Sequence, residues 1–97
     1  MKAIFISCNQ ALYEETQQIM EKYGVRGYTS WEELGGCGTS TGEPHLGTTT
    51  WPTLNSAILA FVEDEQCDPF LAALKELDTN NPLLGLRAFW WVVGGTF

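Results

Sequence analysis

Two hydrophobic periodicities alternate along these 97 residues, and that alternation constrains the fold more than any other feature of the sequence. Apolar, β-branched and aromatic residues indicate four strands, at 2–7, 27–34, 54–63 and 86–93. Apolar residues three and four positions apart indicate a helix between the first two strands and another between the last two. The predicted order of elements is therefore βαββαβ.

Polar residues and glycine mark the expected helix ends. Asn9 is a suitable N-cap for the first helix, and Gly24 supplies a left-handed stop. For the second helix, Asp64 or Asp68 is the expected cap, with Pro69 in the first turn. That helix is expected to end near Asp78, with an inner stripe of Leu71, Leu74 and Leu77.

This order of elements in so short a chain predicts one α+β domain over residues 1–97 with a ferredoxin-like fold. The expected architecture is a four-stranded antiparallel sheet with two helices on one face. A single layer of helices leaves the other face of the sheet bare, although the strands are apolar in both directions. We therefore expect a homo-oligomer that covers the second face.

Four tryptophans are the candidate interface residues: Trp31, Trp51, Trp90 and Trp91. Because adjacent residues of a strand point to opposite faces, either Trp90 or Trp91 must point away from the helices. That tryptophan is the best interface candidate. Trp51 closes the long loop, where it stacks on a ligand or anchors the loop to the sheet.

Charge and hydropathy exclude several classes of partner. The net charge of −7 disfavours nucleic acid and anionic membranes. No apolar run approaches the roughly 18 residues of a membrane helix, and no export signal is recognisable. The three cysteines (Cys8, Cys37 and Cys67) lack a CxxC spacing and are expected to be reduced thiols. We expect a soluble cytoplasmic protein.

Residues 35–52 form one long loop with five glycines and two prolines. Its clustered glycines allow backbone N–H groups to approach an anion such as a nucleotide phosphate. A mobile connection also needs glycine, so both interpretations stay open. Arg87 is the expected cationic complement, with Arg26 second.

Three segments carry a resemblance to the PII signal-transduction family. Gly36-Cys37-Gly38-Thr39-Ser40-Thr41-Gly42 keeps the glycine spacing of the family's G-F-G-R-Q-K-G at the base of its long loop. Val62-Glu63-Asp64-Glu65-Gln66 resembles the family's strand-to-helix junction, and Gly85-Leu86-Arg87 stands where the family has G-D-G-K. Thr39 and Ser40 replace the family's arginine and glutamine, which makes this chain similar to a divergent, short-loop member.

The resemblance implies a homotrimeric regulatory protein of nitrogen signalling and not an enzyme. A small ligand, such as an adenine nucleotide, would bind in the clefts between copies, and the loop at 35–52 would change its contact with a target protein. The implied ligand-binding residues are Gly35, Gly36, Cys37, Gly38, Thr39, Ser40, Gly42 and Arg87.

Two alternatives use other residues of the same loop. The first is a trimer that binds a divalent metal ion, similar to the CutA proteins, through Cys37, Glu43 and His45. The second is a small cysteine-dependent enzyme, in which His45 lowers the thiol pKa of Cys37 and acts as its base.

Overall fold

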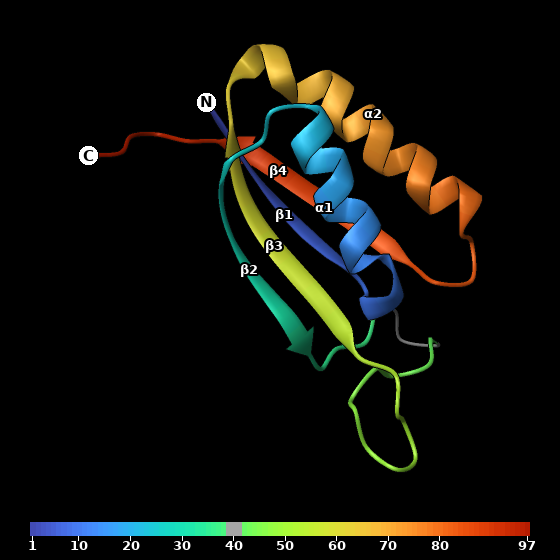
Figure 1. Cartoon of the computed structure of the whole chain (residues 1–97). Helices are drawn as coiled ribbons and strands as arrows, with labels where there is room; N and C mark the ends of the chain where they lie inside the picture. The colour runs from blue at the N-terminus through green and yellow to red at the C-terminus, as the bar shows by residue number, and fades with distance from the viewer. Residues whose placement is uncertain (39–41) are drawn as a thin grey trace.

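A four-stranded antiparallel sheet carries both helices on one face in the computed structural model, which describes residues 1–38 and 42–97 (Figure 1). The strands are β1 Lys2–Asn9, β2 Gly27–Leu34, β3 Asn55–Val62 and β4 Leu86–Val92, in the spatial order β2-β3-β1-β4. The helices are α1 Tyr13–Lys22 and α2 Asp64–Asn80, and a short 3₁₀ turn, η1 Gln10–Leu12, precedes α1. The predicted ferredoxin-like fold is confirmed.

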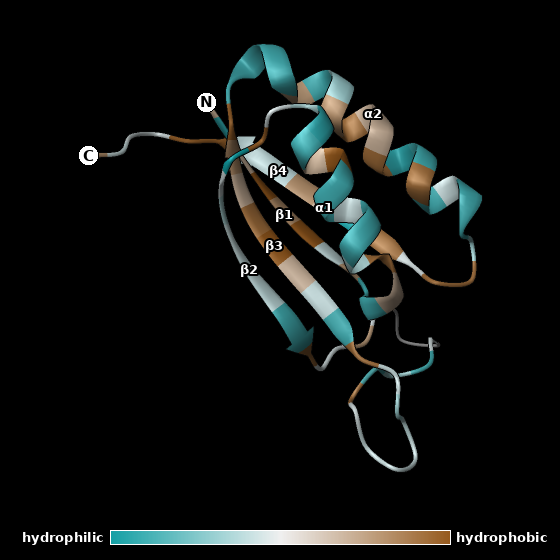
Figure 2. Cartoon of the chain, in the orientation of Figure 1, coloured by the Kyte–Doolittle hydropathy of each residue, from teal (hydrophilic) through white to brown (hydrophobic). Residues whose placement is uncertain are grey.

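β1 lies in the middle of the sheet because it pairs along its whole length with β3 on one side and along most of it with β4 on the other. Its residue Ile4 lies opposite Ala60 of β3 and Trp90 of β4, so these three side chains share the face under the helices. Most of the buried side chains gather between this face and the helices, where Figure 2 shows apolar strands beneath the inner sides of α1 and α2.

The predicted cap Asn9 and the predicted stop Gly24 flank the first helical segment, but Asn9 caps a 3₁₀ turn and not the α-helix itself. The Asn9 side chain accepts a hydrogen bond from the Ala11 backbone N–H at 2.9 Å, and Gly24 adopts a φ of 70° that favours glycine. Asn9 opens the 3₁₀ turn, and the α-helix follows from Tyr13. Among the described residues, neither helix is long and apolar enough to cross a membrane.

Of the two residues expected to open α2, Asp64 does so, as the first helical residue and not as the cap. The expected place of Pro69 was wrong, because it is the sixth residue of the helix instead of a first-turn residue. Glu63 precedes the helix, and its backbone N–H donates to the Gln66 side chain at 3.0 Å. The Gln66 amide also donates to the Gly24 carbonyl at 3.1 Å, which ties the start of α2 to the end of α1. The helix continues to Asn80, two residues past the predicted end.

The face of the sheet away from the helices carries large aromatic side chains that this chain leaves exposed. Strand pairing places Trp31, Phe61, Phe89 and Trp91 on this side, and they are 43, 43, 59 and 50% exposed. We call this surface the open face. The sequence indicates that both faces of β3 are covered, but within one chain only the helix face is.

Candidate functional site

The long loop between β2 and β3 contains two closed lobes. Gly36 and His45 exchange both backbone hydrogen bonds at 2.7 Å, which closes a first lobe over residues 36–45. The Gly47 N–H donates to the Thr53 carbonyl at 3.2 Å, which closes a second lobe over residues 47–53. The described residues of the loop, 35–38 and 42–52, contain neither helix nor long strand, as predicted, but backbone bonds divide the loop into two separately closed segments (Figure 1).

A side-chain contact ties the first lobe to the sheet. The His45 ring nitrogen Nδ1 lies 2.6 Å from Oδ1 of Asn55, the first residue of β3. A Cβ atom at Gly36 would lie only 2.7 Å from the Asn55 amide nitrogen, so any larger residue there would force the Asn55 side chain to shift. Sequence reasoning missed Asn55. The signal that marks it is the polar pair Asn55-Ser56 at the start of an otherwise apolar strand.

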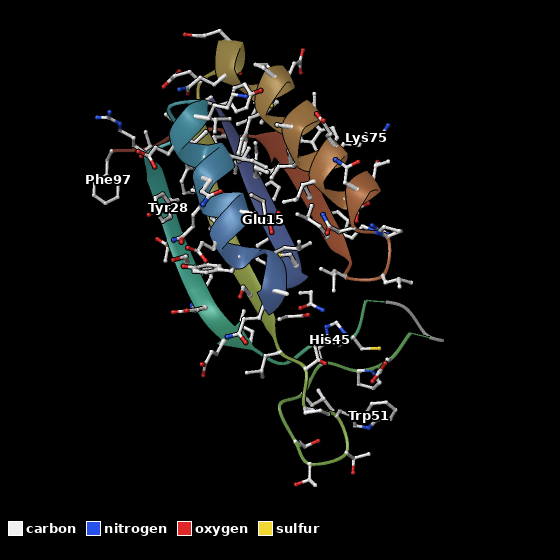
Figure 3. All side chains as sticks on the ribbon, turned by 45° about the vertical axis from the view of Figure 1, so that its right-hand side comes forward. Glu15, Tyr28, His45, Trp51, Lys75 and Phe97 are labelled. Carbon is white, nitrogen blue, oxygen red and sulfur yellow. The ribbon has the colours of Figure 1, made fainter. Side chains whose placement is uncertain are left out.

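The loop base and the turn before β4 meet at the same end of the sheet. The Asn9 N–H donates to the Gly85 carbonyl at 3.0 Å, and the Gln10 N–H donates to the Leu54 carbonyl at 3.0 Å. These bonds bring the end of β1, the start of β3 and the start of β4 together. We call this region the loop end, and Figure 3 shows His45 there.

Arg87 lies at the loop end with its guanidinium two-thirds exposed. Its Nη1 donates to the Leu86 carbonyl at 2.7 Å and lies 3.3 Å from Oδ2 of Asp78. An exposed ion pair of this kind stabilises a fold by only about 0–1 kcal/mol, so an anionic ligand can compete with Asp78. Arg26, the second predicted cation, precedes β2 at the opposite end of the sheet.

The other predicted ligand residues lie on the first lobe or beside it. Gly35 and Gly36 form its base, whereas Gly38 and Gly42 are exposed farther along it. The Cys37 thiol is exposed and lies 3.5 Å from the Gly42 carbonyl oxygen. Thr39 and Ser40 lie outside the described residues.

The described residues of one chain do not assemble the metal alternative. In residues 1–38 and 42–97, no three histidine, cysteine or acidic side chains gather as a metal ion would require. Cys37, Glu43 and His45 therefore do not form a metal site by themselves. For the cysteine-dependent alternative, Nδ1 of His45 is engaged by Asn55 and the Cys37 sulfur contacts Gly42. Asn55 is thus the group that orients this imidazole.

The core below the loop end contains the buried thiol of Cys8. Burial raises the pKa of Cys8 above its ordinary value, and a side-chain hydrogen bond with Thr16 lowers it by less. A buried thiol with a raised pKa is a poor nucleophile at neutral pH. Cys8 is therefore a core residue, as is the buried Cys67.

Comparison with known proteins gives a structural likeness only. No family model matches the chain, and no curated protein matches it in sequence. Solved structures do match. CPII from Thiomonas intermedia K12, a nitrogen regulatory PII-like protein bound to ADP, AMP and bicarbonate, superimposes with a TM-score of 0.74 at 24% identity. That match covers 93% of this chain and 82% of CPII.

Two further structures agree. The apo form of the same CPII gives a TM-score of 0.65 at 20% identity, covering 98% of this chain and 92% of that one. A protein from Thermus thermophilus, described as a putative PII-like signalling protein, gives 0.68 at 19% identity and covers 93% and 83% of the two chains. The predicted resemblance is confirmed at the level of the fold: this chain has the fold of the PII-like proteins.

Proposed function

We propose that this protein is a PII-like regulator that binds an adenine nucleotide at the loop end and reports its occupancy through the two lobes of residues 35–53. The observation that carries the proposal is the meeting of a glycine-rich lobe and an exposed arginine at one end of a PII-like fold. ADP and AMP are bound in the CPII structures that resemble this chain, which supports this class of ligand.

Arg87 and the first lobe have complementary roles in this proposal. The guanidinium supplies charge-assisted hydrogen bonds to phosphate oxygens, which are stronger than neutral ones. Gly38 is exposed, and no atom of the described residues beyond its chain neighbours lies within 4 Å of a notional Cβ there, which leaves room for a ligand. Both features favour an anion over a neutral metabolite.

The open face is the surface through which copies assemble. Burying a large apolar side chain stabilises a structure by about 1.5–3 kcal/mol, and four aromatic residues here are about half exposed. A trimer packed through this face would place the loop end of one copy beside its neighbour. The nucleotide would then lie in a cleft between two copies.

Regulation, not catalysis, is the proposed output, and the cytoplasm is its proposed compartment. The lobes are held by a few hydrogen bonds, each contributing about 0.5–1.5 kcal/mol. Ligand contacts of similar size are therefore enough to shift the lobes between two arrangements. A target protein that contacts the lobes would sense that shift.

Native mass spectrometry and calorimetry with ADP, ATP and AMP test the proposal. We expect a trimer that gains up to three nucleotides. Arg87→Gln should weaken binding about 10-fold or more, because a hydrogen bond to a charged group contributes about 1.5–3 kcal/mol. Arg26→Gln removes the same charge at the other end of the sheet and is the matched control.

Two results would contradict the proposal. A trimer that binds none of the three nucleotides would remove the ligand class, and an equal loss in both arginine variants would remove the assigned site. Zinc is included as a separate titration. Uptake of zinc alone, abolished by His45→Ala, would favour the metal-binding alternative.

A further inference from the structure

An apolar groove lies between α2 and β4, remote from the open face. Its volume is about 440 Å³. Leu71 and Leu74 of α2 form one wall, and Leu86, Ala88 and Trp90 of β4 form the other. Trp90 is 54% exposed, so this groove presents a large aromatic surface to water. At the loop end the groove is also lined by Arg87 and Asp78, so it borders the proposed nucleotide site.

The two edge strands of the sheet are protected very differently. β2 carries Glu32 and Glu33 at a break in its register, and such charges and irregularities discourage pairing with another strand. β4 pairs regularly with β1 and ends in the apolar run Ala88–Val92. Its outer edge is therefore the one that needs a covering strand, and the groove lies beside it.

The chain also contains an extended segment that contacts almost nothing. After β4, the Val93 N–H donates to the Met1 carbonyl at 3.1 Å, and residues 94–97 are all exposed. Figures 1 and 3 show this segment leaving the body on the side of β2, with Phe97 beyond that strand. The Phe97 side chain is fully in water.

The extended segment and the β4 edge with its groove therefore lie at opposite edges of one molecule, because the strand order is β2-β3-β1-β4. A contact between unlike surfaces at opposite edges is head-to-tail, and repetition of such a contact closes a ring when the rotation between copies allows it. A neighbour placed beyond β2 with its own β4 edge turned inward would meet the segment.

We propose that residues 93–97 of one copy bind along the β4 edge of the next copy, with Phe97 in the groove between α2 and β4. In an extended segment, Val93, Gly95 and Phe97 share one face, so the two apolar side chains point into the groove with a glycine between them. The arrangement is strand addition with a side-chain pocket. It rests on the proposed homotrimer.

Disulfide trapping tests this contact in the full chain. In a Cys37→Ser background, which removes the exposed thiol, Phe97→Cys is combined with Ala72→Cys on the groove. Under mild oxidation at low protein concentration, non-reducing gels should show covalent dimers and trimers for most of the protein. The matched control combines Phe97→Cys with Gln18→Cys on the exposed side of α1, and should give at least 10-fold less cross-linked product.

The outcomes separate this inference from the function on which it rests. A trimer by native mass spectrometry with no Phe97–Ala72 cross-link, or with equal cross-linking in the control pair, overturns the docking of residues 93–97 and leaves the regulator intact. A disulfide formed within one chain overturns docking between copies. Absence of any trimer overturns both the contact and the proposed assembly.

Discussion

The two faces of the sheet carry similar side chains and differ in what covers them. Val62 and Phe61 are adjacent in β3, yet Val62 is 1% exposed under the helices and Phe61 is 43% exposed on the open face. The same contrast holds in β1, where Ile4 is buried on the helix face and Phe5 is partly exposed on the open face. The strands carry apolar side chains on both faces, but the two helices cover only one of these faces.

Small residues on the open face sharpen the contrast. Ala3 and Ala57 lie on that side and are nearly inaccessible, because the large aromatic residues around them leave no room for water. The open face is thus already packed within the chain, with aromatic surface uppermost. An apolar surface of that kind marks an interaction site in a protein that remains in solution.

The largest expected effect comes from breaking the helix face. Phe70 of α2 is completely buried, and Phe70→Ala should lower the free energy of unfolding by about 3–5 kcal/mol because it removes packing and leaves a cavity. Urea denaturation measures this loss. Phe89→Ala on the open face is the control, and at concentrations where the chain is monomeric it should cost less than about 1 kcal/mol. Equal losses would contradict the distinction between the faces.

Breaking the open face should leave the fold and remove the assembly. Trp91→Asp places a charge where the copies are proposed to meet, and burial of an unpaired carboxylate is costly. Sedimentation velocity should show association weakened about 100-fold or more, with an unchanged far-UV circular dichroism spectrum. Gln18→Asp adds the same charge on α1 and should not alter assembly. A Trp91→Asp variant that remains trimeric would place the interface elsewhere.

Most of the fold could be predicted because each element repeats its own signal. The strand bounds agree with the structure within two residues, since alternating and continuous apolar runs identify strands over their whole length. Asn9 and Gly24 could also be predicted, because caps and left-handed stops depend on a single residue and its nearest neighbours.

Most of the features that were missed depend on residues far apart in the sequence. The Gln66 amide bonds a carbonyl 42 residues away, so no local pattern indicates that the start of α2 is tied to the end of α1. The hydrogen bond between Glu63 and Gln66 is local, and sequence reasoning missed it. His45 and Asn55 meet only because the first lobe folds back onto β3. Sequence reasoning predicted that Arg87 binds a ligand but did not predict its ion pair with Asp78. That pair joins α2 to β4 across a turn, so no local pattern indicates it.

The loop end belongs to neither face, and a variant there should therefore alter neither core nor assembly. Asn55→Ala removes the hydrogen bond to His45, which should open the first lobe by about 0.5–1.5 kcal/mol. Amide hydrogen exchange should accelerate at Gly36 and His45, whose N–H groups close the lobe. Asn80→Ala, at the exposed end of α2, is the control. Unchanged exchange at both amides would show that the backbone bridge holds the lobe alone.

The smallest expected effect is a pH dependence confined to the helix face. Burial raises the pKa of the Cys8 thiol, so the folded chain keeps this proton at a pH where the unfolded chain loses it. The resulting stability is complete below the ordinary thiol pKa of 9.0 and falls as pH rises above it, by at most about 1.4 kcal/mol per pH unit. Urea denaturation between pH 8 and 10.5 should therefore show a shallower decline of the free energy of unfolding with pH for Cys8→Ala than for the parent.

The other ionisable groups are common to both proteins, so the measured quantity is the difference between their two slopes of unfolding free energy against pH. A parent slope in Cys8→Ala would mean that water reaches the core beneath the helices at high pH.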